Sequence, residues 1–261
     1  MKNLISGSAE IPPISSFNYK LERREALQVL HRHDDAHLAI AVKSDDRFTP
    51  LFSMQTETLE ASLESHRLRL EKDSFVSINA AYGTHKDRPN HKEKTLRYLC
   101  ACYCDIDFYN LGRTFPETLQ LVHDACGDGL LPTPSIVVNS GRGMWLLWLL
   151  CDANDNDRAH LGGWHDNPKS HLQLYRASHR KIGLVLAPFG SDSACQDAAK
   201  YIRIPGSLHT GSEGVVEWYR QTHSLPVYTL AELADALQIP ASERGQPVRV
   251  NNFETVRNEV Y

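Results

Sequence analysis

The chain has 261 residues, a mass of 29.5 kDa and a formal net charge of −4 at pH 7. This length can bury a sizeable core without disulfide bonds, and 41% hydrophobic with 23% charged residues excludes a disordered, collagen-like or coiled-coil chain. The longest apolar run, residues 144–151, is far shorter than the roughly 20 residues of a membrane helix, and the N-terminus lacks the sustained apolar segment of a secretory signal. We therefore expect a cytoplasmic globular protein with no membrane partner.

Six cysteines stand at positions 100, 102, 104, 126, 151 and 195. None forms a Cys-x-x-Cys pair, and three alternate along one expected strand, where thiols on one face are poorly placed to form a disulfide. Zinc sites usually need close Cys/His pairs, so zinc binding is the less favoured alternative. We expect the cysteines to be reduced, buried and structural.

The N-terminal part is expected to mix helices and strands. Residues 1–20 are polar and rich in Ser and Pro, which predicts a loosely held arm. Apolar residues then recur first at helical spacing and later in short β-type runs. The expected elements are a helix over 21–33, a hairpin of 38–42 and 48–54 around an Asp45-Asp46 turn, a helix over 56–72 and a strand over 73–83.

The next part contains the most distinctive strand. The run YLCACYCDIDFYN, residues 98–110, is rich in residues that favour a buried strand. Alternation places Asp105 and Asp107 on one face with Ala101 and Tyr103. The opposite, core-facing side would carry Cys100, Cys102, Cys104, Ile106 and Phe108.

Further elements follow in regular order. They are a helix over 114–129, a hairpin over 134–150, a helix over 172–186, a strand over 214–220, a helix over 229–239 and a polar tail over 241–261. Because helices and strands are mixed and hairpins make the sheet at least partly antiparallel, the expected fold class is α+β or mixed α/β.

The acid pair Asp105 and Asp107 is the best candidate metal site. Carboxylates at i and i+2 on a strand lie roughly 6 to 7 Å apart at the backbone, close enough to share one or two hard divalent cations. A solvated strand face is the structural alternative. The apolar character of the rest of the strand favours a cation, because charge there is costly unless it is compensated.

A second candidate lies in the hairpin turn around Ser140, Gly141, Arg142 and Gly143. The glycines let the backbone approach an anion, and Arg142 can donate a charge-assisted fork to a phosphate. The alternative is an ordinary turn, since Asn and Gly are common in hairpins.

The third candidate is the segment from Asp197 through Lys200 and Arg203 to His209. It combines an acid, two cations and a Pro-Gly turn, although a helix end followed by a loop has similar residues. Arg203 lies between two isoleucines, and a guanidinium in an apolar run needs an anion such as a bound phosphate.

Together the three segments resemble the archaeo-eukaryotic primase superfamily, the primase-polymerases, and most closely its RepB-type replication primases of plasmids and mobile elements. CDIDFYN is similar to the first motif of that superfamily, VVNSGRGMWLLW to the second and DAAKYIRIPGSLH to the third, over roughly residues 98–218. The third match is the most specific, because the acid, the basic residue and Arg-Ile-Pro-Gly all fall at the family's positions.

The resemblance implies a primase or primase-polymerase that makes primers on single-stranded DNA from nucleoside triphosphates. It implies Mg²⁺ or Mn²⁺ held by the catalytic residues Asp105, Asp107 and Asp197. The nucleotide would be bound near its triphosphate by Ser140, Arg142, Arg203 and His209. A replicative helicase or initiator would be a further partner.

Two departures from the family pattern stand out. Trp145 fills the position where the second motif commonly carries a His that assists triphosphate binding, and Gly211 stands where relatives often carry Lys. A two-metal nuclease, which would not need Arg142 and Arg203, is one alternative function. A nucleic-acid-binding replication accessory without catalysis is another.

The resemblance also predicts the domain organisation. We expect a flexible arm over 1–20 and a catalytic domain over 21–240, with two abutting α/β modules over about 21–95 and 96–225. The second module would contain an RRM-like, mainly antiparallel sheet that carries the acids. Residues 241–261 would be a linker or tail toward a further C-terminal domain.

Overall fold

The computed structural model describes residues 17–31, 36–44, 47–55, 73–82, 84–85, 88–89, 91–151, 163–164, 168–192, 197–212 and 214–244. The expected arm before residue 17, the Asp45-Asp46 turn, the helix over 56–72, Cys195 and the tail after residue 244 lie outside these residues.

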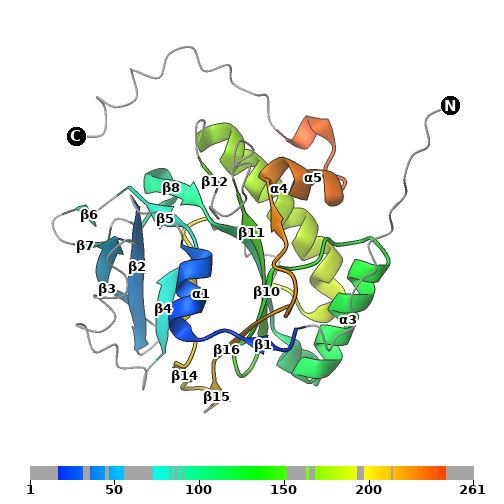
Figure 1. Ribbon diagram of the computed structural model, residues 1–261, viewed down its shortest axis with the longest axis horizontal. Helices are drawn as coiled ribbons and strands as arrows, with labels where there is room; N and C mark the ends of the chain where they lie inside the picture. Colours follow the sequence, from blue (N-terminus) through cyan, green and yellow to red (C-terminus); the bar gives the residue numbers. More distant parts are fainter. Residues whose placement is uncertain are drawn as a thin grey trace.

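Two β-sheets lie side by side at the centre of the molecule (Figure 1). We call them the β9 sheet and the β2 sheet. In the β9 sheet the order is β1-β16-β10-β11-β17, and β9 also pairs with β11. Its strands are β1 (Tyr19–Lys20), β9 (Ala101–Ile106), β10 (Ile136–Asn139), β11 (Met144–Leu150), β16 (Glu217–Arg220) and β17 (Val227–Tyr228). All of its pairs are antiparallel except β11 with β17.

The β2 sheet has the order β12-β8-β5-β2-β4-β13, with β3 pairing β2. Its strands are β2 (His37–Ser44), β3 (Arg47–Gln55), β4 (Ser74–Ser77), β5 (Ala80–Ala81), β8 (Leu96–Leu99), β12 (Gly163–Trp164) and β13 (Tyr201–Arg203). Two small hairpins pair β6 (Thr84–His85) with β7 (Arg88–Pro89) and β14 (Leu208–His209) with β15 (Gly214–Val215).

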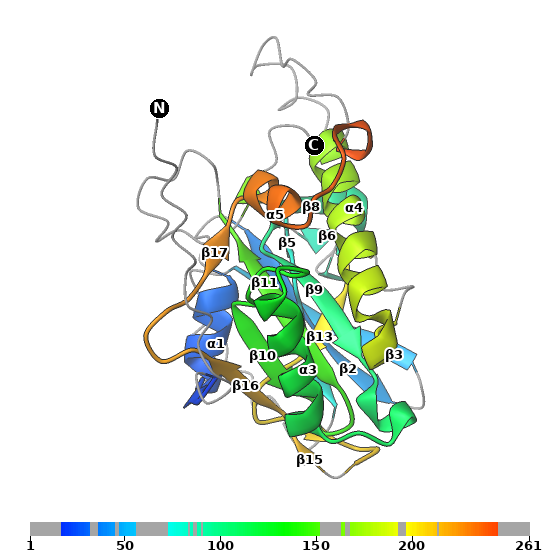
Figure 2. The ribbon, with the colours of Figure 1, turned by 90° about the vertical axis from the view of Figure 1, so that its right-hand side faces the viewer.

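Helices pack on both faces of the β9 sheet. Figure 2 shows α3 and α4 lying across this sheet, while α1 lies on the other side, close to both sheets. The helical elements are α1 (Arg23–Leu30), α3 (Phe115–Gly127), α4 (Pro168–Leu186) and α5 (Leu230–Ala236), with 3₁₀ turns η3 (Glu93–Thr95), η4 (Phe108–Leu111), η5 (Ala187–Phe189) and η6 (Ala241–Glu243). The mixed α+β fold with a mainly antiparallel sheet is confirmed.

Two of these helices begin at residues that sequence chemistry favours. Thr114 accepts a hydrogen bond from the backbone of Glu117, whose side chain reaches back to Thr114, and this capping box starts α3. Thr229 and Glu232 form the same arrangement at the start of α5. Both helices therefore begin where the local sequence predicts.

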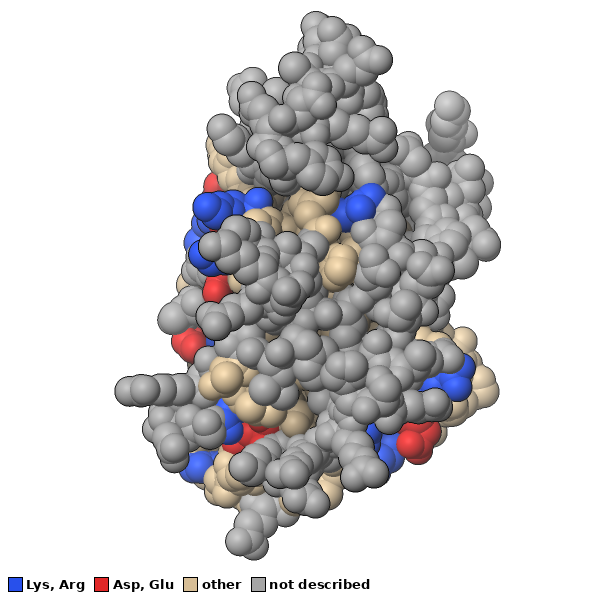
Figure 3. Space-filling model, turned by 90° about the vertical axis from the view of Figure 1, so that its left-hand side faces the viewer, with Lys and Arg blue, Asp and Glu red and all other residues tan. Residues whose placement is uncertain are grey.

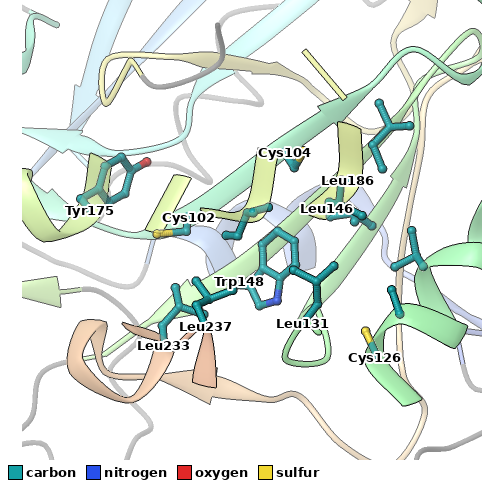
Figure 4. Close-up of a cluster of buried hydrophobic side chains, with 14 of the residues drawn as sticks. Cys102, Cys104, Cys126, Leu131, Leu146, Trp148, Tyr175, Leu186, Leu233 and Leu237 are labelled. Atoms are coloured by element: carbon teal, nitrogen blue, oxygen red, sulfur yellow. The ribbon is translucent and has the colours of Figure 1, made fainter. Parts of the chain in front are cut away.

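The two faces of the β9 sheet build two hydrophobic cores. One core joins Tyr103, Trp145 and Leu147 to α1 and to the β2 sheet. The other packs Cys102, Cys104, Leu146 and Trp148 against α3, α4 and α5 (Figure 4). The central strands are thus buried on both faces, which explains their nearly continuous apolar sequence.

The strand alternation is confirmed for Cys102, Cys104 and Ile106, but the expectation for Cys100 is wrong. Cys100 belongs to the core between the sheets, and its Sγ lies 3.8 Å from Nδ1 of His31. The chain passes from β8 into β9 at this residue, so it is not part of one continuous strand. Asn79 stabilises the break, because its Oδ1 accepts hydrogen bonds from the backbone N–H groups of Cys100 at 2.7 Å and Ala101 at 3.4 Å.

The five cysteines that the structure describes, at positions 100, 102, 104, 126 and 151, are buried and form no disulfide. No helix in the described ranges is sufficiently long and apolar to cross a membrane. On the face with the β2 sheet, the described charged side chains form small mixed groups of both signs (Figure 3).

Candidate active site at the end of β9

The acid pair lies where β9 leaves the sheet. Asp105 is the penultimate residue of β9, and Asp107 precedes η4. Burial, helped by the negative charge of Asp107, raises the pKa of Asp105 to about 7. Burial and the charge of Asp192 raise the pKa of Asp107. The two carboxylates thus share a partly desolvated site in which negative charge is costly.

A third acid comes from the segment after α4. The backbone N–H of Asp107 donates to the carbonyl of Gly190 at 2.9 Å, and the N–H of Asp192 donates to the carbonyl of Asp105 at 3.0 Å. These bonds hold Asp192 beside the end of β9, where its charge raises the pKa of both acids. Sequence reasoning missed Asp192, which no motif distinguishes.

The glycine hairpin between β10 and β11 packs directly on the acid strand. A Cβ on Gly143 would lie 2.9 Å from the carbonyl oxygen of Ile106 and 3.5 Å from Oδ1 of Asp107. Gly141 has φ of +90°, which favours glycine. Both residues are therefore needed for the turn to approach the acids this closely.

Ser140 stabilises the turn itself. Its hydroxyl donates to the carbonyl of Gly143 at 3.0 Å and accepts from the N–H of Gly143 at 3.1 Å. The side chain is buried, at 4% exposure. The nucleotide-binding role expected for Ser140 stays a prediction, and its contacts give it a role in shaping the hairpin.

Arg142 and His209 converge on the β14–β15 hairpin. A Cβ on Gly211 would meet Nη1 of Arg142 at 3.1 Å and Cε1 of His209 at 3.0 Å, so both side chains pack against this glycine. The guanidinium of Arg142 also lies 4.4 Å from the ring centroid of Tyr109. Its positive charge lowers the pKa of Asp107 and opposes the other effects there.

His209 is held in one orientation by its own turn. Its Nδ1 accepts a hydrogen bond from the N–H of Gly211 at 3.0 Å. Burial and the neighbouring charge of Arg203 lower the pKa of His209, so the ring is neutral at pH 7 and carries its proton on Nε2.

Lys200 brings another cation to the acids. Its Nζ lies 5.7 Å from the ring centroid of Trp145, and its charge acts to lower the pKa of both Asp105 and Asp107. Trp145 is the cross-strand partner of Asp105, and its ring stacks on the ring of Tyr103 with 5.6 Å between the centroids. Trp145, which stands where the second motif commonly carries a His, therefore contacts Lys200 beside the acid pair.

Arg203 has an acidic partner within the protein. Its Nε donates to Oδ1 of Asp73 at 3.2 Å, and its guanidinium lies 4.9 Å from the ring centroid of Phe75. The structural alternative to phosphate binding, a pair with a buried acid, is thus present. The charge of Arg203 nevertheless reaches the site, since it acts to lower the pKa of Asp105.

Asp197 is exposed at the edge of this region. Its backbone carbonyl accepts a hydrogen bond from Tyr103 at 2.8 Å, and its charge acts on His91. Among the residues that the structure describes, no three His, Cys, Asp or Glu side chains are grouped as metal ligands. The coupled carboxylates of Asp105 and Asp107 suit a hard cation, and Asp197 as the third ligand stays a prediction.

Comparison with known proteins identifies the architecture. The AEP domain of the primase-polymerase from cyanophage S-2L superposes with a TM-score of 0.50 at 13% sequence identity, over 81% of this chain and 94% of that domain. The chain has the archaeo-eukaryotic primase fold. The resemblance that the three motifs suggested is thus confirmed at the level of the fold.

Two further comparisons add context. A curated replication protein of Clostridium perfringens is 24% identical over 195 residues, which are 73% of this chain and 43% of that protein, so the chain spans less than half of its length. The catalytic domain of the primase RepB′, solved in complex with initiator DNA, gives a TM-score of 0.47 at 12% identity over 86% of this chain and 98% of that one. No family model matches the sequence.

Proposed function

We propose that the chain is a replication primase of the RepB-type branch, which makes primers on single-stranded DNA from nucleoside triphosphates in plasmid or mobile-element replication. The observation that carries this proposal is the meeting of an acid pair with cations from two segments, the β10–β11 hairpin and the segment that leads into β13. Arg142, Lys200 and Arg203 all exert their charge on Asp105 or Asp107. The primase fold and the likeness to a replication protein support the same function.

The arrangement suits nucleotidyl transfer. Mg²⁺ or Mn²⁺ bound by Asp105, Asp107 and Asp197 would activate the attacking 3′-hydroxyl and neutralise the leaving pyrophosphate. Arg142 and Arg203 would bind the triphosphate through their planar N–H groups, which match phosphate oxygens. Neutral His209 would donate its Nε2 proton to the same group. A nuclease has no comparable need for cations on the triphosphate side.

Lys200 would take over from the missing histidine of the second motif. Its ammonium group is placed by the face of Trp145, at the strand position that pairs with Asp105. A lysine there supplies permanent positive charge, whereas a histidine would be only partly charged at pH 7. The substitution therefore changes the source of the charge and keeps the function.

Incorporation of radiolabelled nucleotides on unprimed single-stranded DNA with Mn²⁺ tests the proposal. Labelled products from the wild-type chain and none from Asp105→Asn are expected. Asp235→Asn, a matched Asp substitution in α5, should retain activity. Shortened template without incorporation would indicate the nuclease, and binding without either reaction would indicate the accessory protein.

A further inference from the structure

Asp73 is a buried acid outside the three motifs. It precedes β4, and its side chain is only 6% exposed. A buried carboxylate is costly unless it is paired and hydrogen-bonded. Asp73 has both kinds of partner: Nε of Arg203 at 3.2 Å, and Thr210 through its N–H at 3.3 Å and its Oγ1 at 2.6 Å.

The bond to Asp73 uses only one edge of Arg203. A guanidinium has five N–H donors in a rigid plane, and Asp73 accepts from Nε alone. Within the part of the chain that the structure describes, Nη1 and Nη2 of Arg203 make no hydrogen bond. Asp73 on one side and the ring of Phe75 at 4.9 Å therefore orient the side chain while two nitrogens are left for a ligand.

The other partner of Asp73 is Thr210, in the turn that connects β14 and β15. Thr210 directly follows His209, and the turn continues to Gly211, against which His209 and Arg142 pack. Both oxygens of Asp73 are used, Oδ1 on Arg203 and the Thr210 backbone and Oδ2 on the Thr210 hydroxyl. One carboxylate thus ties β13 to the β14–β15 hairpin.

We propose that Asp73 is a positioning residue, which orients Arg203 and the turn over residues 209–211 toward the triphosphate of the incoming nucleotide. The inference rests on the proposed function. Because the negative charge of Asp73 offsets the positive charge of Arg203, Asp73 contributes to phosphate binding through geometry and not through charge. It orients Nη1 and Nη2 of Arg203 so that both can donate to phosphate oxygens. Asp73 itself does not touch the nucleotide.

Ligand binding without turnover tests this role. The affinity of the full chain for a nucleoside triphosphate with a non-hydrolysable α,β bond, and for inorganic tripolyphosphate, would be measured by calorimetry with Mn²⁺. Asp73→Asn should weaken both ligands about tenfold, or roughly 1.4 kcal/mol. Thr210→Val, which removes only the hydroxyl bond, should weaken both by roughly threefold. Asp235→Asn, which removes a distant Asp–Arg pair with Arg244, should change neither affinity.

The outcomes separate the two proposals. If the wild-type chain binds neither ligand, the proposed function fails and the inference fails with it. If the wild type binds both ligands and Asp73→Asn binds them equally well, only the positioning role is overturned. A loss confined to the nucleoside triphosphate would overturn the assignment to the phosphates.

Steady-state kinetics provide a second measurement. The KM for nucleotide should rise in Asp73→Asn while kcat stays within about threefold, because binding geometry and not the reacting groups has changed. A lower melting temperature with an unchanged KM in the folded fraction would mean that Asp73 is merely structural. If Asp73→Asn does not fold, Thr210→Val decides, and wild-type affinity in that variant would overturn the proposal.

Discussion

The ionisation of Asp105 is the most consequential property at the scale of single residues. Burial and the nearby Asp107 raise its pKa from 3.8 to about 7 in the folded protein. The folded state therefore holds a proton between about pH 4 and 7 that the unfolded state has released. Stability contributed by the protonated carboxyl is present at low pH and is lost as the pH rises through 7.

Replacing Asp105 by Asn should remove its contribution to this pH dependence of stability. In metal-free protein at pH 8, Asp105→Asn should melt at the same temperature as the wild type or higher, because a buried charge and its repulsion with Asp107 are removed. The fall in melting temperature between pH 6 and 8 should be smaller in the variant. Thermal unfolding at both values measures this. A variant less stable than the wild type at pH 8 would show that Asp105 has a structural role.

Substitutions of Asp192 and Asp197 should have different effects on the melting temperature. Asp192→Asn should raise the melting temperature of the metal-free protein, because the charge of Asp192 raises the pKa of both active-site acids. Asp197→Asn should leave that temperature unchanged and reduce the increase produced by Mn²⁺, if Asp197 is the third ligand. Melting curves with and without Mn²⁺ compare the two variants. The opposite pattern would make Asp192 the ligand.

At the scale of elements, the glycine hairpin requires close contact with β9. Gly143→Ala would place a Cβ 2.9 Å from the carbonyl oxygen of Ile106, and backbone cannot yield as a flexible side chain can. We expect a loss of about 1–3 kcal/mol in the free energy of unfolding. Nucleotide binding should also weaken, since the turn must move away from Asp107.

A matched glycine substitution serves as the control. Gly183 lies in α4, and a Cβ there would meet nothing within 4 Å. Gly183→Ala should stabilise the protein by about 0.5–1 kcal/mol, because alanine favours the helix. Denaturant unfolding of both variants measures the difference. Equal effects from the two substitutions would show that the hairpin tolerates a Cβ.

The elements that the sequence predicted are those with a local cause. Alternation in β9, the hairpin of β10 and β11, and the Thr-led start of α3 depend on neighbours within a few residues, so they could be predicted. The pairing of Asp73 with Arg203 joins residues 130 positions apart and leaves no local pattern. Cys100 was misplaced because alternation assumes one strand where the chain changes sheets.

At the scale of the whole molecule, the β9 sheet is covered on both sides. Cys102 and Cys104 face the helical core, and Cys100 lies in the core between the sheets. Thiol reagents should therefore label all three slowly in the native protein, and faster only when the fold opens globally. Peptide mapping after timed labelling measures each rate. Rapid native labelling of Cys102 and Cys104 would contradict the orientation of β9.

The expected modules over 21–95 and 96–225 stay a prediction, and the strands of the two sheets alternate along the chain. β8 precedes β9, β10 and β11 in the sequence and β13 follows them, yet both belong to the β2 sheet. Phe75 of β4 thus pairs with Arg203 of β13.

This interleaving affects how the protein folds during synthesis. On the ribosome, the edge of β4 has no partner until residues 201–203 have left the exit tunnel, and β1 must wait for β16. An uncovered strand edge is prone to pair with other chains. The nascent chain would therefore carry these uncovered strand edges until residues 201–220 have been synthesised.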